Sequence, residues 1–313
     1  SRRRQVAGAL TKRAPMNSCT ENATAQQLRA DSWYQEHLVN NVAVLAVLCV
    51  LDHLLLKPWV LKRVGPSSKK SDVTLARWFF LHSFANLCVC ATAFNSIRAV
   101  LDDPTHALDS SVFHDSSPFG NASVWPLTII NSVHVYHMIG GFRLSGADYF
   151  HHLVFIPTIG FPGQLFPWGA LGNFQAFFIS GLPGGVDYFM LGLQKVKLLN
   201  GMTEKRINAN LNTWCRTPGI LASTVLLYQA LKLGRYQVPM WAAALQLALP
   251  PYNALCTRLA PSFELPTPSP FAATSPDQSF RFCCASLIAR AHNKGWRYPH
   301  ARRPFLWWSC APR

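Results

Sequence analysis

Apolar runs of membrane length recur along most of this chain and restrict the folds open to it. About 20 residues are needed to cross a bilayer as a helix, and seven such runs lie between residues 38 and 255. They cover about 38–56, 78–101, 124–142, 147–165, 166–193, 218–233 and 238–255. Half of the residues are hydrophobic and only 14% are charged, which is too few charges for the surface of a soluble domain. The sequence therefore predicts an all-α, polytopic transmembrane helix bundle with about seven crossings.

The fifth run is too long for one straight crossing. Proline and glycines interrupt it at Gly181-Leu182-Pro183-Gly184-Gly185, and these residue types break or kink helices. We expect a bent or re-entrant helix at this point.

Two signals in the connecting loops give the same orientation. Glycosylation sequons occur at Asn22, before the first crossing, and at Asn121, between the second and third, so both acceptors fall on one side of the membrane. The loops after the first and fifth crossings are rich in lysine and arginine, and the second of these ends at Arg216. Because such loops favour the cytosol, we predict a lumenal N-terminus, a cytosolic C-terminus and candidate glycosylation at Asn22 and Asn121.

The two ends differ from the middle of the chain. Of the net charge of +15, residues 1–15 carry +5 and residues 256–313 carry +6. A basic start opposes a lumenal location, which leaves Met16 as an alternative beginning. We divide the chain into a polar N-terminal segment (1–36), a transmembrane domain (37–255) and a basic tail (256–313). The tail has no helical or strand period, and we interpret it as disordered or as a mispredicted exon, with a folded C-terminal domain as the alternative. Basic residues are not interleaved with aromatics on one polar face, which excludes a nucleic-acid partner.

One acid and two adjacent histidines, Asp148, His151 and His152, open the fourth apolar run. An ionisable side chain that faces hydrocarbon costs roughly 2.5 to 3.5 kcal/mol, so these groups should face a bundle interior, a cavity or the interface. His134 and His137, three positions apart, share one face of the preceding crossing. Because the connection between the two crossings is short, the helices should be antiparallel neighbours. We expect three of the four imidazoles to cluster near the cytosolic leaflet.

Asp148 precedes His151 by three positions and His152 by four, so on a helix its carboxylate can reach one imidazole. Such a bond fixes the ring tautomer and raises the basicity of the other nitrogen, as a general base requires. The alternative is that Asp148 caps the helix and the histidines are interfacial. Asp187 is a further candidate, because its segment echoes the one around Asp148. We interpret other polar residues in apolar surroundings as structural, namely Asp52, His53, His82 and Lys232.

The segment Asp148-Tyr149-Phe150-His151-His152-Leu153-Val154, with His134-Val135-Tyr136-His137 upstream, resembles the TLC domain of TRAM, Lag1-type ceramide synthases and CLN8 proteins. The resemblance covers about residues 37–255 and implies a lipid partner in the endoplasmic reticulum or a related endomembrane. In the ceramide-synthase branch, the paired histidines transfer a fatty acyl group from acyl-CoA to a sphingoid amine. The resemblance therefore makes His151, His152 and Asp148 candidate catalytic residues, and His134, His137 and Asp187 candidate substrate-binding residues.

The sequence departs from the ceramide-synthase branch after the histidines. That branch continues with a His-Asp pair and further acids, whereas Phe161-Pro162-Gly163-Gln164 follows here. The departure favours the TLC branches that handle lipid or membrane composition without established catalysis.

We therefore expect a multi-pass endomembrane protein that binds or modifies lipid and has no resident cofactor or metal. One alternative is a ceramide-synthase-like N-acyltransferase with acyl-CoA as co-substrate. Another is a metal-dependent lipid hydrolase whose ligands come from the four histidines and Asp148. A third is a seven-helix receptor, although Phe142-Arg143-Leu144 stands where an Asp-Arg-Tyr-like triplet would be expected. Whether turnover occurs, which lipid is handled and the oligomeric state stay open.

Overall fold

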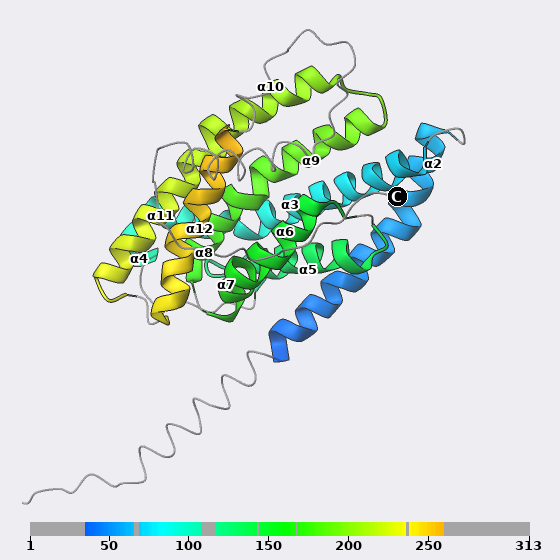
Figure 1. Ribbon diagram of the computed structural model, residues 1–313. Helices are drawn as coiled ribbons and strands as arrows, with labels where there is room; N and C mark the ends of the chain where they lie inside the picture. The colour runs from blue at the N-terminus through cyan, green and yellow to red at the C-terminus, as the bar shows by residue number, and fades with distance from the viewer. Residues whose placement is uncertain are drawn as a thin grey trace, which may run out of the picture.

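The computed structural model describes residues 35–65, 69–107, 117–142, 144–166, 168–235 and 238–259. These residues are 86% helical and contain no strand, which confirms the predicted all-α class. Asn22, Met16 and the tail beyond residue 259 lie outside the described residues. The helices pack side by side, and the first helix runs along one edge of the bundle (Figure 1).

Four of the eight described helical runs continue through one π-helical turn, labelled η. The first helix, Gln35–Val64, includes η1 (Leu51–Leu56) and α2 (Lys57–Val64). It is followed by α3 (Lys70–Asp102), α4 (Pro104–Ala107) and α5 (Trp125–Ile139). The next helical run consists of α6 (Gly146–Phe155), η3 (Ile156–Gly160) and α7 (Phe161–Leu165). A second run consists of α8 (Gly169–Ala176), η4 (Phe177–Gly181) and α9 (Leu182–Lys195). A third consists of α10 (Gly201–Leu211), η5 (Asn212–Arg216) and α11 (Thr217–Lys232). The described chain ends with α12 (Met240–Leu259).

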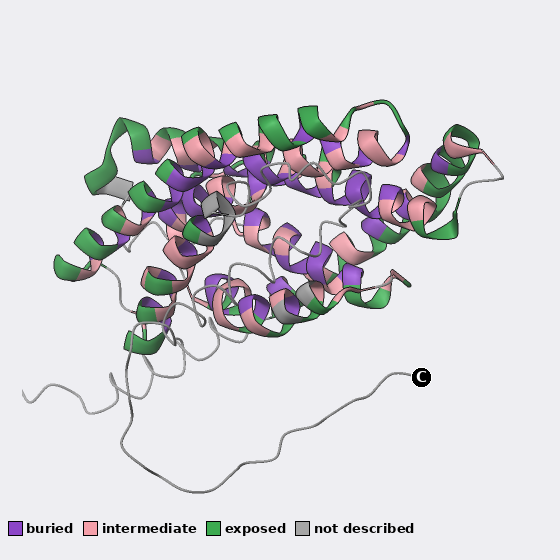
Figure 2. Ribbon diagram, turned by 45° about the horizontal axis from the view of Figure 1, so that its top comes forward, coloured by how far each residue is buried: buried purple, intermediate pink, exposed green. Residues whose placement is uncertain are grey.

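Three of the described helices are long and apolar enough to cross a membrane: Gln35–Val64, Lys70–Asp102 and Gly169–Lys195. The first of them exposes large apolar side chains such as Leu38 and Leu54. Buried positions gather between the helices and exposed positions lie on the outside of the bundle (Figure 2). Because soluble proteins rarely expose extended apolar surface, these helices fit a membrane environment.

The expected loop before the sixth run is wrong, whereas the helix boundaries do not test the expected bend at 181–185. The glycines and proline at 181–185 do not break the fifth helix, because the chain stays helical from Gly169 to Lys195. The π-turn η4 precedes Pro183, which therefore lies in the first turn of α9, where a missing N–H is tolerated. The segment before the sixth run is also helical, as α10 and η5. As a result Arg216, expected in a cytosolic loop, is buried with 8% of its surface exposed.

Helix α3 lies at the centre of the bundle and packs against α5, α8 and α9. A Cβ atom on Gly192 of α9 would lie 2.9 Å from the ring of Phe80, and one on Gly181 would lie 3.2 Å from the Sγ of Cys90. Glycines at such positions let two helices approach closely. The close packing places the side chains in the middle of α3 directly against α9.

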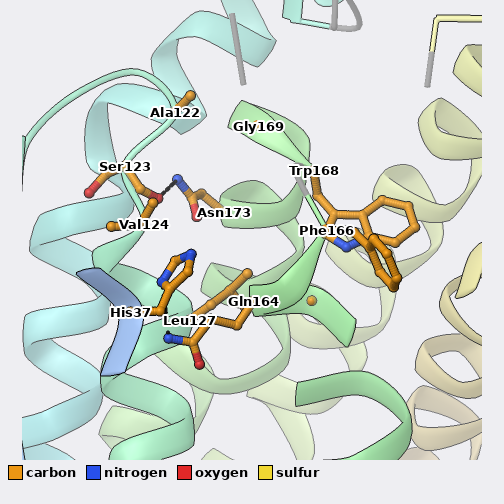
Figure 3. Close-up of a pocket in the computed structure, with 11 residues that line it drawn as sticks. His37, Ala122, Ser123, Val124, Leu127, Gln164, Phe166, Trp168, Gly169 and Asn173 are labelled. Atoms are coloured by element: carbon orange, nitrogen blue, oxygen red, sulfur yellow. Dashed lines mark hydrogen bonds between the residues drawn. The ribbon is translucent and has the colours of Figure 1, made fainter. Parts of the chain in front are cut away.

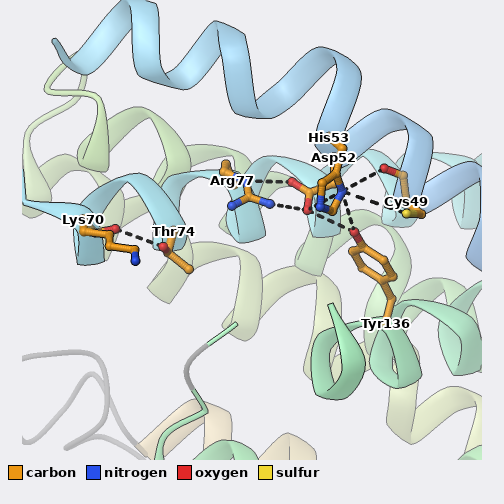
Figure 4. Close-up of polar contacts among 7 residues, drawn as sticks. All are labelled: Cys49, Asp52, His53, Lys70, Thr74, Arg77 and Tyr136. Atoms are coloured by element: carbon orange, nitrogen blue, oxygen red, sulfur yellow. Dashed lines mark hydrogen bonds and ion pairs between the residues drawn. The ribbon is translucent and has the colours of Figure 1, made fainter. Parts of the chain in front are cut away.

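A buried ion pair joins the first helix to α3 and α5 (Figure 4). Asp52, in η1, is fully buried. Its carboxylate accepts two hydrogen bonds from Arg77 of α3 and one, at 3.0 Å, from the hydroxyl of Tyr136 of α5. A buried charge needs such partners because its desolvation is costly. The network therefore fixes α5, the helix that carries His134 and His137, relative to its two neighbours.

Candidate functional site

Five histidines from three helices meet inside the bundle. We call the set the histidine cluster; it consists of His82 of α3, His134 and His137 of α5, and His151 and His152 of α6. Neighbouring rings in the cluster have centroids 5.0 to 5.6 Å apart. His151 is partly exposed and the other four are buried. The structure thus brings together all four histidines selected from the sequence and adds His82.

One hydrogen-bonded chain runs from a backbone carbonyl through His134 to His151. The Nδ1 of His134 lies 2.6 Å from the carbonyl oxygen of Ile130, so this nitrogen must carry the proton. The Nε2 of neutral His134 is then an acceptor, and it lies 3.1 Å from the Nε2 of His151. His151 therefore donates from Nε2, and its Nδ1 is the basic nitrogen of the ring.

A second chain of the same kind runs through His152 to His137. The Nδ1 of His152 donates to the carbonyl oxygen of Asp148 at 2.5 Å, and its Nε2 accepts from the Nδ1 of His137 at 3.2 Å. The Nε2 of His137 is therefore the second basic nitrogen. The His137 ring is stacked on Trp78, with centroids 3.6 Å apart. Each chain thus ends in an imidazole whose basic nitrogen has no hydrogen bond to a described residue.

The carboxylate of Asp148 caps α6 and does not contact an imidazole. It accepts a hydrogen bond from the backbone N–H of Ser145 at 2.8 Å, while the Ser145 hydroxyl accepts from the N–H of Asp148 at 3.2 Å. These two bonds form a capping box. The expected carboxylate–imidazole bond is wrong, because helical side chains lean toward the N-terminus and bring this carboxylate to a free amide. The backbone carbonyl of Asp148 fixes the tautomer of His152 instead.

Asp187 lies in α9 and borders the histidine cluster through its neighbour. The ring of Tyr188 is stacked on His82, with centroids 3.9 Å apart. The Oδ1 of Asp187 is buried without a hydrogen-bond partner. His82, which the sequence led us to interpret as structural, therefore belongs to the site. No sequence signal places His82 there, because its proximity to the other histidines depends on how α3 packs against α5.

A polar seam continues along α5 from the histidine cluster toward the start of the helix. Thr128, Asn131 and His134 are three positions apart and all are buried. Gln164 of α7 joins the first two, because its Nε2 donates to Thr128 at 3.2 Å and its Oε1 accepts from Asn131 at 2.8 Å. The seam therefore holds α7 against the part of α5 that lies between the histidine cluster and the loop before α5.

A small pocket lies at the far end of this seam (Figure 3). The Nε2 of Gln164 lies 3.2 Å from the Nδ1 of His37, and the Nδ2 of Asn173 donates to the carbonyl oxygen of Ser123 at 2.8 Å. The pocket has a cavity volume of about 30 Å³. Because these lining groups already pair with protein atoms, the pocket is a weaker candidate site than the histidine cluster.

No group of three or more His, Cys, Asp or Glu side chains is arranged to hold a metal ion in the part of the chain that the structure describes. Two of the contacts in the histidine cluster place a ring nitrogen against another ring nitrogen with one proton between them. The Asp148 carboxylate is turned toward Ser145. Among the described residues, the geometry therefore supplies no set of three ligands for a metal-dependent hydrolase.

This chain matches no protein-family model, no curated protein and no solved structure. The TLC resemblance accordingly rests on the quoted residues of α5 and α6.

Of the two glycosylation candidates, the structure describes Asn121. It is exposed in the segment before α5, and its carbonyl oxygen accepts a hydrogen bond from Ser96 at 2.6 Å. The hydroxyl of Ser123, the third residue of the sequon, is directed to the carbonyl oxygen of Pro118 at 3.2 Å. The acceptor side chain is thus at the surface while the end of its sequon is folded inward.

Proposed function

We propose that this chain is a TLC-type integral membrane protein that binds a lipid headgroup at the histidine cluster. The observation that carries the proposal is the pair of basic ring nitrogens, the Nδ1 of His151 and the Nε2 of His137, which the two hydrogen-bonded chains leave as acceptors. A polar group in apolar surroundings is costly without a hydrogen-bond partner. A hydroxyl or ammonium group of a lipid can donate to these two nitrogens.

The proposed membrane arrangement has seven crossings, a lumenal N-terminus and a cytosolic C-terminus in the endoplasmic reticulum or a related endomembrane. Basic residues at one end of the bundle support this orientation. Lys62 and Arg63 end α2, Lys70 begins α3, and Lys195 ends α9, where its Nζ lies 3.5 Å from Asp72. An excess of Lys and Arg marks the cytosolic side.

Photo-crosslinking with a lipid probe tests the proposal. The wild-type protein, a His151→Ala/His152→Ala variant and a His53→Ala control are compared in nanodiscs. His53 is exposed on the first helix and outside the cluster. We expect equal labelling of wild type and control, and labelling of the double variant lower by about tenfold, equivalent to about 1.4 kcal/mol. Equal labelling of all three folded proteins would remove the cluster from lipid binding.

A ceramide-synthase-like N-acyltransferase is the second candidate, favoured by the chain that ends at His151. The Nδ1 of His151 would accept a proton from an attacking amine as the amine nitrogen bonds to the thioester carbonyl of acyl-CoA. The C–S bond then breaks and the same proton passes to the departing thiolate, giving an amide and CoA. Purified protein incubated with acyl-CoAs and long-chain amines tests this step. Absence of a His151-dependent amide removes this candidate and leaves lipid binding in place.

A further inference from the structure

A second group of polar residues, each with a buried atom, lies between α3, α9 and the helix formed by η5 and α11. We call it the Arg216 group; it consists of Asn86, Asp187, Arg216 and Thr217. Each of them has a buried atom without a hydrogen-bond partner, namely the Nδ2 of Asn86, the Oδ1 of Asp187, the Nε of Arg216 and the Oγ1 of Thr217. Asn86 and Arg216 are only 1% and 8% exposed. Unpaired buried groups are rare in folded proteins, so four on adjoining elements indicate a missing partner.

Gly184 lets two donors of this group come close to the backbone of α9. A Cβ atom built on Gly184 would lie 2.8 Å from the Nδ2 of Asn86 and 3.9 Å from the Nη2 of Arg216. Both donors therefore approach the same glycine surface of α9. Asp187 follows Gly184 by three positions and lies on the same side of the helix. Two donors and one carboxylate are thus brought to a single region of the bundle.

The two charges of the group are close enough to interact but are not in contact. Asp187 and Arg216 influence each other electrostatically. They form no ion pair, because the ion pairs found in the described chain, with N···O distances within 4.0 Å, do not include Asp187 with Arg216. The hydrogen bond found for Arg216 runs from Nη1 to the Oδ1 of Asn212 at 2.6 Å. A buried charge without a bonded counter-charge is strongly unfavourable. The Asp187 carboxylate and the Arg216 guanidinium are therefore each available to bind an oppositely charged group of a ligand.

We propose that the Arg216 group binds a zwitterionic lipid headgroup, with its oxyanion on Arg216 and Asn86 and its ammonium on Asp187. An anion alone would leave Asp187 unpaired and add a like charge beside it. An amine alone would leave Arg216 unpaired. A zwitterion satisfies both and keeps the region neutral, which buried charges require.

This inference rests on the proposed lipid-binding function and specifies the headgroup. Tyr188, next to Asp187, is stacked on His82 of the histidine cluster. A headgroup held by the Arg216 group is therefore adjacent to the cluster, so one lipid can contact both.

Four probes with hydrocarbon chains of the same length test the inference on the purified full-length protein. Lysophosphatidylethanolamine carries both charges, lysophosphatidic acid only the oxyanion, a long-chain alkylamine only the ammonium, and monoacylglycerol neither. We expect the wild type to bind the zwitterion about tenfold more tightly than each of the other three. Arg216→Gln should abolish the preference, and Arg98→Gln, at an exposed position of α3, should retain it.

A second variant separates recognition from folding. Asp187→Asn removes the ammonium partner and leaves Arg216 in place, so it should bind lysophosphatidic acid as tightly as the zwitterion. Equal binding of all four probes by the wild type overturns this inference and leaves lipid binding standing. A wild-type preference for lysophosphatidic acid also overturns it. Failure to bind any probe, monoacylglycerol included, overturns both this inference and the proposed function.

Discussion

Arg77 holds the carboxylate of Asp52 with two parallel hydrogen bonds, from Nε to Oδ1 at 2.9 Å and from Nη2 to Oδ2. The two residues are 25 positions apart and lie on neighbouring helices. In this bidentate geometry two N–H groups of the planar guanidinium bind the two carboxylate oxygens. The pair therefore fixes the relative orientation of the two side chains in addition to their ionic attraction. Because Asp52 is fully buried, the pair determines how the first helix is seated on α3.

Removal of Arg77 alone is expected to destabilise the fold strongly. Arg77→Met leaves a buried carboxylate without its counter-charge, and breaking such a pair costs roughly 3–5 kcal/mol. Unfolding followed by circular dichroism in detergent micelles measures the loss. Asp52→Asn/Arg77→Met should recover most of it. As a control, Lys195→Met breaks a partly exposed pair and should cost less than about 1 kcal/mol; equal losses for the two pairs would contradict the prediction.

The two hydrogen-bonded chains predict the tautomer of four histidines. His134, His152 and His137 should carry their proton on Nδ1, and His151 should carry it on Nε2. Nitrogen-15 chemical shifts of labelled histidines, assigned by single substitutions, distinguish the two forms. An Nε2-protonated His134 would show that the chain does not start at the Ile130 carbonyl.

Substitution of Gly192 should disturb the contact between α3 and α9. The Cβ of Gly192→Ala would lie 2.9 Å from the Phe80 ring, and overpacking of this kind costs about 1–3 kcal/mol. At Gly185 the nearest atom to an added Cβ is 3.4 Å away, so Gly185→Ala should be neutral or stabilising by about 0.5–1 kcal/mol. Thermal unfolding compares the two. Phe80→Leu should rescue Gly192→Ala, and absence of rescue would mean that the ring is not the obstacle.

The proposed orientation predicts which connections can receive glycans. Asn121 is exposed in the segment before α5 and should be modified in the lumen, so Asn121→Gln in a chain lacking Asn22 should abolish the glycosidase-sensitive mass shift. A sequon introduced between α2 and α3 should stay unmodified. A glycan on that introduced site would reverse the orientation.

The sequence was sufficient for the local features of the site. The three-residue spacing of His134 and His137, and the short connection before His151, predicted a cluster of three of the four imidazoles on adjoining antiparallel helices, and the structure brings all four together. Nothing in that spacing identified His82, 52 positions before His134 in the chain, because its proximity depends on how α3 crosses α5. For Asp148 the sequence left two alternatives open, and the structure decides between them: the carboxylate caps α6, and the backbone carbonyl fixes the tautomer of His152.

Arg216 shows even more clearly the difference between what the sequence determines and what the tertiary structure determines. In the sequence it follows other basic residues and resembles a loop charge, whereas in the fold it is buried beside Asn86 and near Asp187. Apolar periodicity determines that segments become helices, because it reports on each segment alone. Which polar side chains meet is decided by helix crossing, by glycines that permit close approach and by π-turns that rotate one face against the next. Those are properties of pairs of helices, and only the tertiary structure contains them.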